Sequence, residues 1–167
     1  MYLTTHTSAG MLVGALLPHP AAAFAAGVVS HAVLDMIPHE PAEDRINTYP
    51  RDGEHSSSTV RRRISINLFD LVGVFCVIIL GWFFSNLVPA QPDILTGMIS
   101  GIVGSLLPDC IIMLTFFLDS RFLRWFFSVH YRVHFVISHV SVPRKLSIAY
   151  QLLFSCILII ISYFVIT

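Results

Sequence analysis

Three long apolar segments constrain this chain more than any other feature of its sequence. The segments 66–88, 94–118 and 146–167 are each long enough to cross the ~30 Å hydrocarbon core of a bilayer as a helix. Only 12% of the residues are charged, about half the share found in soluble domains. The sequence therefore predicts an all-α, polytopic membrane helical bundle, and it excludes a disordered chain or a typical soluble globule.

Two shorter apolar segments, 7–17 and 20–36, come first and are separated by Pro18-His19-Pro20, which interrupts a helix. As helices they would reach roughly 17–25 Å, less than the bilayer core. We therefore expect a shallow or re-entrant N-terminal helical hairpin beside three full spans. The segment 122–140 is aromatic but contains Arg and His, which predicts an interfacial helix. Together these elements form one integral membrane domain over 1–167.

The distribution of basic residues predicts the orientation. The polar segment 39–63 carries five arginines, 119–145 carries four arginines and one lysine, and the turn 89–93 carries none. Because loops rich in Lys and Arg stay in the cytoplasm, 39–63 is expected to be a solvated cytoplasmic loop. The same rule predicts a cytoplasmic N-terminus, an external 89–93 turn and an external C-terminus.

The overall charge excludes one class of partner. Ten basic and ten acidic residues cancel, so there is no basic excess to attract nucleic acid, and the lipid bilayer is the expected partner. The three cysteines lie far apart in apolar runs, which favours small apolar filling residues over a disulfide framework or a zinc ribbon. The oligomeric state is left open.

Ionisable residues at the ends of the apolar segments are the candidate functional groups, because a charge there is costly. His6 lies thirteen residues before a turn centred on residue 19, so its antiparallel partner is near His31. Asp70 lies about twenty residues before the 89–93 turn, so its partner is near Asp109. We expect these residues, with Asp35, to share one depth at the cytoplasmic face, within about 10 Å.

Histidine and carboxylate ligands recur at helical spacing. His31 and Asp35 are four residues apart, as are His130 and His134, so each pair shares one helix face. Imidazole and carboxylate together suit Zn²⁺, and also Mn²⁺ or Fe. The sequence predicts one or two ions, and the alternative is a scatter of interfacial polar residues. The predicted metal ligands are His6, His31, Asp35, Asp109, His130 and His134.

Two nine-residue strings resemble one another. Gly27-Val-Val-Ser-His-Ala-Val-Leu-Asp35 matches Gly101-Ile-Val-Gly-Ser-Leu-Leu-Pro-Asp109 at its Gly, second Val and Asp positions. A duplicated hairpin would place the two acids in related positions around one site. Glycines such as Gly97, Gly101 and Gly104 are expected where helices pack closely.

These strings also carry a family resemblance. The first resembles the GxxSHxxxD signature of small bacterial membrane-bound metal-dependent hydrolases, and Leu106-Leu-Pro-Asp109 resembles their LPD element. His6 is similar to the early His of that family, and His130-Tyr-Arg-Val-His134 is similar to its HRxxTH element. A more remote likeness is to helical zinc-dependent phospholipase C. The resemblance, carried by four short patches of the chain, implies a bacterial inner-membrane enzyme that hydrolyses a phosphoester.

The leading hypothesis is a metal-dependent hydrolase acting on a phospholipid or polyprenyl phosphate at the cytoplasmic interface. Asp70 is the expected general base, and Arg132 is expected to hold a phosphate, or else to anchor in lipid headgroups. The alternatives are a proton- or cation-coupled transporter, in which the three acids form a path, and a non-catalytic membrane scaffold. The sequence does not assign roles to His39 and His139.

Overall fold

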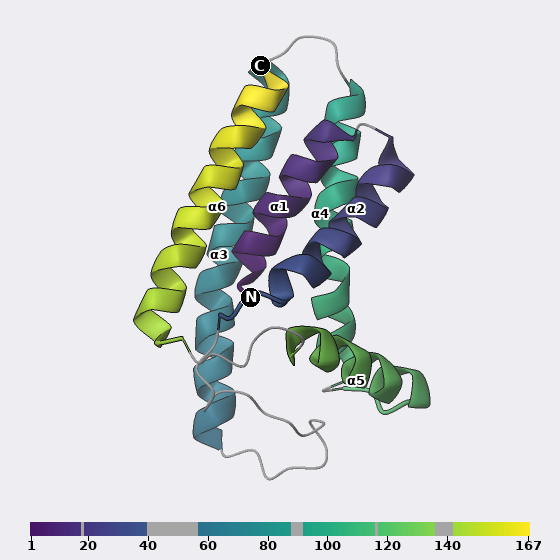
Figure 1. The fold of residues 1–167 in the computed structure, drawn as a ribbon, viewed down its shortest axis with the longest axis vertical. Helices are drawn as coiled ribbons and strands as arrows, with labels where there is room; N and C mark the ends of the chain where they lie inside the picture. The colour runs from purple at the N-terminus through teal and green to yellow at the C-terminus, as the bar shows by residue number, and fades with distance from the viewer. Residues whose placement is uncertain (18, 40–56, 88–91, 116, 136–141) are drawn as a thin grey trace.

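The chain forms a helical bundle in the computed structural model (Figure 1). The structure describes residues 1–17, 19–39, 57–87, 92–115, 117–135 and 142–167, without the side chains of 57–69, 92, 134, 135 and 144. These residues form helices α1 Leu3–Leu16, α2 Pro20–Asp35, α3 Ser57–Leu87, α4 Pro92–Leu114, α5 Arg121–Phe135 and α6 Arg144–Ile166. No strand occurs in the described part of the chain, which confirms the all-α fold class.

Three of the helices are long and apolar enough to cross a membrane. The qualifying stretches are Asp70–Leu87 in α3, Asp93–Leu114 in α4 and Lys145–Ile166 in α6. Their outward faces carry large exposed apolar side chains such as Ile79 and Phe164, which would be unfavourable in water and are suited to lipid. The three predicted full spans are confirmed, and the chain is an integral membrane protein.

The short hairpin of α1 and α2 lies inside this frame. Pro20 occupies the first turn of α2, where its missing N–H costs nothing. Helix α1 packs against α4, α2, α6 and α3, and in Figure 1 it lies between the α3–α6 pair and α4. Every side chain from Thr5 to Met11 is buried, as expected of a helix enclosed on all sides. Helices α3 and α4 therefore make little direct contact, and each faces α1 instead.

Small residues allow the hairpin to approach α4 closely. A Cβ atom on Gly10 or Gly14 would overlap the backbone of α4, and one on Gly27 would overlap the carbonyl oxygen of Gly101. A Cβ on Gly104 would in turn overlap the carbonyl oxygen of Phe24. The predicted role in close packing is confirmed for Gly101 and Gly104, and the backbones of α1, α2 and α4 meet at Gly10, Gly27 and Gly101.

The boundary of the polar segment differs from the expectation. The loop predicted over 39–63 is shorter, because α3 already begins at Ser57 and 57–63 is helical. Once a long helix exists, each residue added at its end gains a hydrogen bond without a new nucleation cost, so the helix extends beyond the apolar stretch. Residues 40–56 lie outside the described part of the chain.

Helix α5 is oriented differently from the spans. It follows α4 after a short connection and runs across the end of α4, transverse to the long helices (Figure 1). It ends at Phe135, and the remainder of the predicted segment, 136–140, lies outside the described residues. Its transverse course at the end of a span is the placement expected of an interfacial helix.

Candidate metal centre

Helix α2 supplies two adjacent ligands from its last turn. His31 and Asp35 lie four residues apart on the buried face, and each is only 1% exposed. His31 Nε2 lies 2.9 Å from Asp35 Oδ2. Because α2 is otherwise apolar and its last turn faces α1 and α4, the two side chains point into the bundle rather than toward lipid.

Helix α4 holds the ring of His31 in place. His31 Nδ1 lies 2.8 Å from the carbonyl oxygen of Ser105, and since a carbonyl can only accept, Nδ1 carries a proton and donates it. Pro108 lies inside α4 and has no N–H, so the carbonyl oxygen of Gly104, next to Ser105, lacks its usual helical donor. The hydrogen bond directs His31 Nε2 toward Asp35 and Asp109, whose Oδ1 is 3.9 Å from it.

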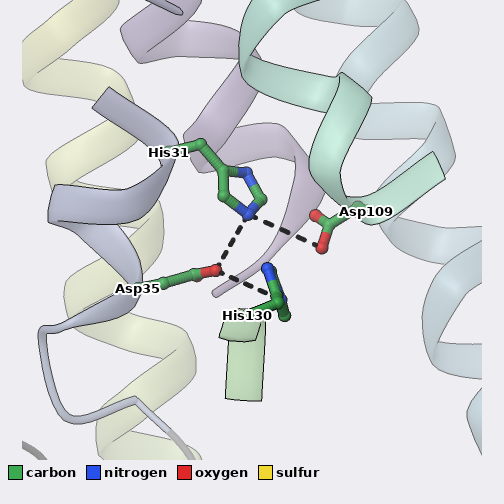
Figure 2. Close-up of side chains that lie close together, drawn as sticks. All are labelled: His31, Asp35, Asp109 and His130. Atoms are coloured by element: carbon green, nitrogen blue, oxygen red, sulfur yellow. Dashed lines mark ion pairs between the residues drawn. The ribbon is translucent and has the colours of Figure 1, made fainter. Parts of the chain in front are cut away.

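Helix α5 supplies the fourth member of the cluster, His130. His130 Nε2 lies 3.7 Å from Asp35 Oδ2, and its ring centroid is 5.3 Å from that of His31. Figure 2 shows the side chains from α2, α4 and α5 converging on one point. The side chains of Asp109 and His130 are 24% and 14% exposed, whereas His31 and Asp35 are almost fully buried, so among the described residues the accessible side of the cluster is that of Asp109 and His130.

The four groups fit a divalent metal. One ligand atom from each of His31, Asp35, Asp109 and His130 lies within 4.8 Å of the others. Two ligands about 2.0–2.1 Å from a tetrahedral zinc stand roughly 3.3 Å apart, and the spacings in the cluster lie on either side of that value. Two imidazoles and two carboxylates are a donor set that zinc, manganese and iron accept.

Buried nitrogen atoms without hydrogen bonds support the fit. In the part of the chain that the structure describes, His31 Nε2 and both ring nitrogens of His6 have no hydrogen-bond partner. The Nε2 atoms of His6 and His31 lie close to the carboxylate oxygens of Asp35, but their angles do not satisfy those of a hydrogen bond. A buried polar atom in this condition costs about 1–3 kcal/mol, and coordination of a cation would remove that cost. The His31 ring, with Nδ1 donating to a carbonyl, has the arrangement typical of a metal-bound histidine.

His6 lies beside the four groups, on the other oxygen of Asp35. His6 Nε2 is 3.1 Å from Asp35 Oδ1, and its ring stacks on that of His31 with centroids 4.1 Å apart. The predicted pairing of His6 with His31 across the first hairpin is confirmed. The N-terminal ammonium of Met1 also forms an ion pair with Asp35 Oδ1 at 2.9 Å, so this oxygen lies between two nitrogen atoms.

Asp70 is used differently from the other acids. Its Oδ1 lies 2.9 Å from the backbone nitrogen of Thr4 and also accepts from the Thr4 hydroxyl, while Oδ2 accepts from the backbone nitrogen of Leu3. Asp70 therefore caps the first turn of α1 from a neighbouring helix. It is not among the four groups that could share an ion, because α1 lies between α3 and α4 and separates it from Asp109.

The remaining predicted residues lie away from the cluster or outside the description. Arg132 is exposed on α5, two residues from His130 and so on another face of the helix. The side chain of His134 and all of His139 lie outside the described residues. His39, left unassigned by the sequence, is buried, and its Nδ1 donates to the carbonyl oxygen of Ile37 at 2.6 Å.

Sequence reasoning missed the Ser105 carbonyl. No side-chain motif marks a backbone oxygen, although Pro108 three residues later indicates an irregular turn.

A scan of protein-family models, a search of curated proteins and a search of solved structures each found no match for this chain. The chemistry of the site therefore rests on its own geometry.

Proposed function

We propose that the protein is a membrane-embedded metal-dependent hydrolase that cleaves a phosphoester. The observation that supports this most is the convergence of His31, Asp35, Asp109 and His130 from three helices, with ligand atoms within 4.8 Å of one another. The Met1 ammonium pairs with Asp35 Oδ1, but the cluster still places a second carboxylate, Asp109, beside two imidazoles, and a divalent cation would offset the cost of holding these groups together. The exposed edge at Asp109 and His130 leaves the site accessible from one side.

A divalent ion bound here would act as a Lewis acid, activating water and polarising a phosphoryl oxygen. Zinc fits the donor set best, with manganese or iron as alternatives. Asp35 and His31 would hold the ion, because they are the most buried members of the cluster. The Ser105 carbonyl keeps His31 in the tautomer that presents Nε2 to the ion.

A general base must be able to reach water and substrate. Asp109 is the more exposed carboxylate of the cluster, so we assign the proton-accepting role to it, and the ion would then be held by His31, Asp35 and His130. The role predicted for Asp70 is not part of this proposal, since both of its carboxylate oxygens accept hydrogen bonds from the start of α1. Asp70 as a base stays a prediction that substitution can test.

The depth of the cluster favours a lipid substrate. His31 and Asp35 end the short hairpin, Asp109 lies near the end of the α4 span, and His130 lies on the transverse helix α5. In a bilayer, a site at these helix ends would lie near the phosphates of the membrane surface. A phospholipid or a polyprenyl phosphate fits this position, with the cytoplasmic leaflet expected from the distribution of arginines.

The experiment measures metal and hydrolysis in the same protein. Purified protein is analysed for bound elements by mass spectrometry, and headgroup or phosphate release is followed with phosphatidic acid, phosphatidylglycerol and a polyprenyl phosphate. Asp35→Ala should lose both metal and activity, while Asp93→Ala, at the opposite end of α4, should keep both. Full hydrolysis by Asp35→Ala would overturn the proposal. Protein that binds no metal and moves ions across liposomes would support a transporter instead.

A further inference from the structure

Helix α5 presents three different faces. One face packs on the bundle and contains Leu123, which is 5% exposed, and His130 of the cluster. A second face carries the exposed apolar side chains Phe122, Trp125 and Val129, spaced i, i+3 and i+7 along one side. These three side chains are 40–59% exposed, so the bundle leaves much of this stripe uncovered.

The third face is basic. Arg121 and Arg132 are both exposed and lie eleven residues apart, which is three helical turns, so they fall on the same side of α5. No acidic partner of either arginine is found among the described residues. Arg124, by contrast, is paired with Asp119 at 2.7 Å. The stripe of aromatic side chains and the two arginines adjoin each other around the helix.

We infer that α5 docks in the surface of a bilayer leaflet that contains anionic lipids, with Trp125 among the acyl chains and Arg121 and Arg132 on lipid phosphates. The apolar stripe needs a partner that is hydrophobic, and the adjoining arginines need one that is anionic. One leaflet offers both partners, because its hydrophobic acyl chains lie just below its anionic headgroup phosphates. Helix α5 runs transverse to the long helices at the end of α4, so its length can lie along that surface (Figure 1).

Because α5 also carries His130, this docking places the open side of the cluster beside lipid headgroups. The inference itself does not require the proposed hydrolase. It concerns a surface of α5 that is separate from the metal ligands, and it can be tested with protein that has no activity.

The two tryptophans of the chain make a direct test possible. Trp82 lies in the α3 span and Trp125 on α5. In Trp82→Phe protein reconstituted in liposomes, all tryptophan fluorescence comes from Trp125. Bromine quenches tryptophan fluorescence at short range. Liposomes are made with brominated phosphatidylglycerol and unbrominated phosphatidylcholine, or the reverse, and the stronger quenching identifies the lipid that is enriched beside Trp125.

Bromine atoms near the headgroup should quench Trp125 more than bromine atoms deep in the acyl chains. Phosphatidylglycerol should be enriched beside Trp125 about 3- to 5-fold over its mole fraction in the bilayer. The double variant Arg121→Gln with Arg132→Gln should lose most of this enrichment, so that the phosphatidylglycerol fraction beside Trp125 approaches its mole fraction in the bilayer. Arg124→Gln is the matched control, and it should keep most of the enrichment because its guanidinium is already paired.

A second measurement uses unaltered arginines and so does not depend on the double variant folding. Raising the salt concentration toward 1 M should reduce the enrichment in Trp82→Phe protein, since screening weakens attraction to phosphates. Water-like emission from Trp125 without quenching by either lipid would overturn the inference. Equal quenching by both lipid classes at low salt would overturn its anionic part.

Discussion

The ring of His31 is held by the backbone of another helix, because its Nδ1 donates to the carbonyl oxygen of Ser105 at 2.8 Å. This bond joins α2 to α4 at the position where glycines allow the two backbones to meet. It also leaves Nε2 of the same ring facing two carboxylates. The histidine therefore has a defined tautomer before any ion binds, which favours metal coordination.

Replacing His31 should remove the metal without unfolding the protein. His31→Ala deletes one of the two most buried ligands, and we expect its bound metal to fall to near background. His19→Ala is the matched control, since His19 is exposed at the turn between α1 and α2. Elemental mass spectrometry of both variants checks the result, with thermal unfolding in detergent measured in parallel. Undiminished metal in His31→Ala would remove this residue from the ligand set.

Substitution of Asp70 should reduce stability more than metal content. Asp70→Asn keeps one oxygen but places an amide N–H₂ against the N–H of Leu3 or Thr4, and Asp70→Ala removes both acceptors. Loss of a helix cap costs about 0.5–2 kcal/mol, so both variants should unfold at lower temperature. Thermal unfolding and elemental analysis test this together.

The same two variants decide between capping and base catalysis. If Asp70 only caps α1, Asp70→Asn should retain metal and most of its turnover at temperatures where it is folded. Turnover lost at unchanged unfolding temperature would restore the role of general base to Asp70. Asp93→Asn, at an exposed acid on α4, serves as the control for a change of charge.

Close helix packing should limit what can replace Gly27. In Gly27→Ala the new methyl group would meet the backbone of α4 at Gly101, which cannot move aside. Overpacking of this kind costs about 1–3 kcal/mol, and it should also displace His31 relative to Ser105 and weaken metal binding. Metal affinity and unfolding temperature are the measurements.

Gly81→Ala is the matched control for that substitution. A Cβ at Gly81 would meet only the flexible ends of the Met98 and Met11 side chains, which can shift. Its unfolding temperature and metal affinity should therefore stay near those of the unaltered protein. Equal loss in both variants would contradict the assignment of Gly27 to a backbone contact.

The predicted orientation can be tested with single cysteines. Cys76, Cys110 and Cys156 are replaced first, and then Ser128→Cys on α5 and Asp93→Cys at the start of α4 are introduced separately. The arginine distribution predicts that position 128 reacts with a membrane-impermeant maleimide from the cytoplasmic side only, and position 93 from the outside only. Labelling of both positions from the same side would contradict the topology.

The sequence alone determined the helical character of the chain, its three spans and its short hairpin. Length, hydropathy and proline positions act locally, and a bilayer leaves helices as the workable form for such segments. The pairing of His6 with His31 followed from the same local arithmetic, because a tight turn fixes which residues of a hairpin face each other.

The tertiary structure determined which groups the carboxylates of Asp70 and Asp109 contact. Counting from the 89–93 turn placed Asp70 opposite Asp109, but α1 lies between their helices, so Asp70 caps α1 while Asp109 faces His31. The use of the Ser105 carbonyl was likewise beyond the sequence, since it depends on how closely α2 approaches α4. Such relations arise from which helices pack together, and spacing along one chain segment does not contain that information.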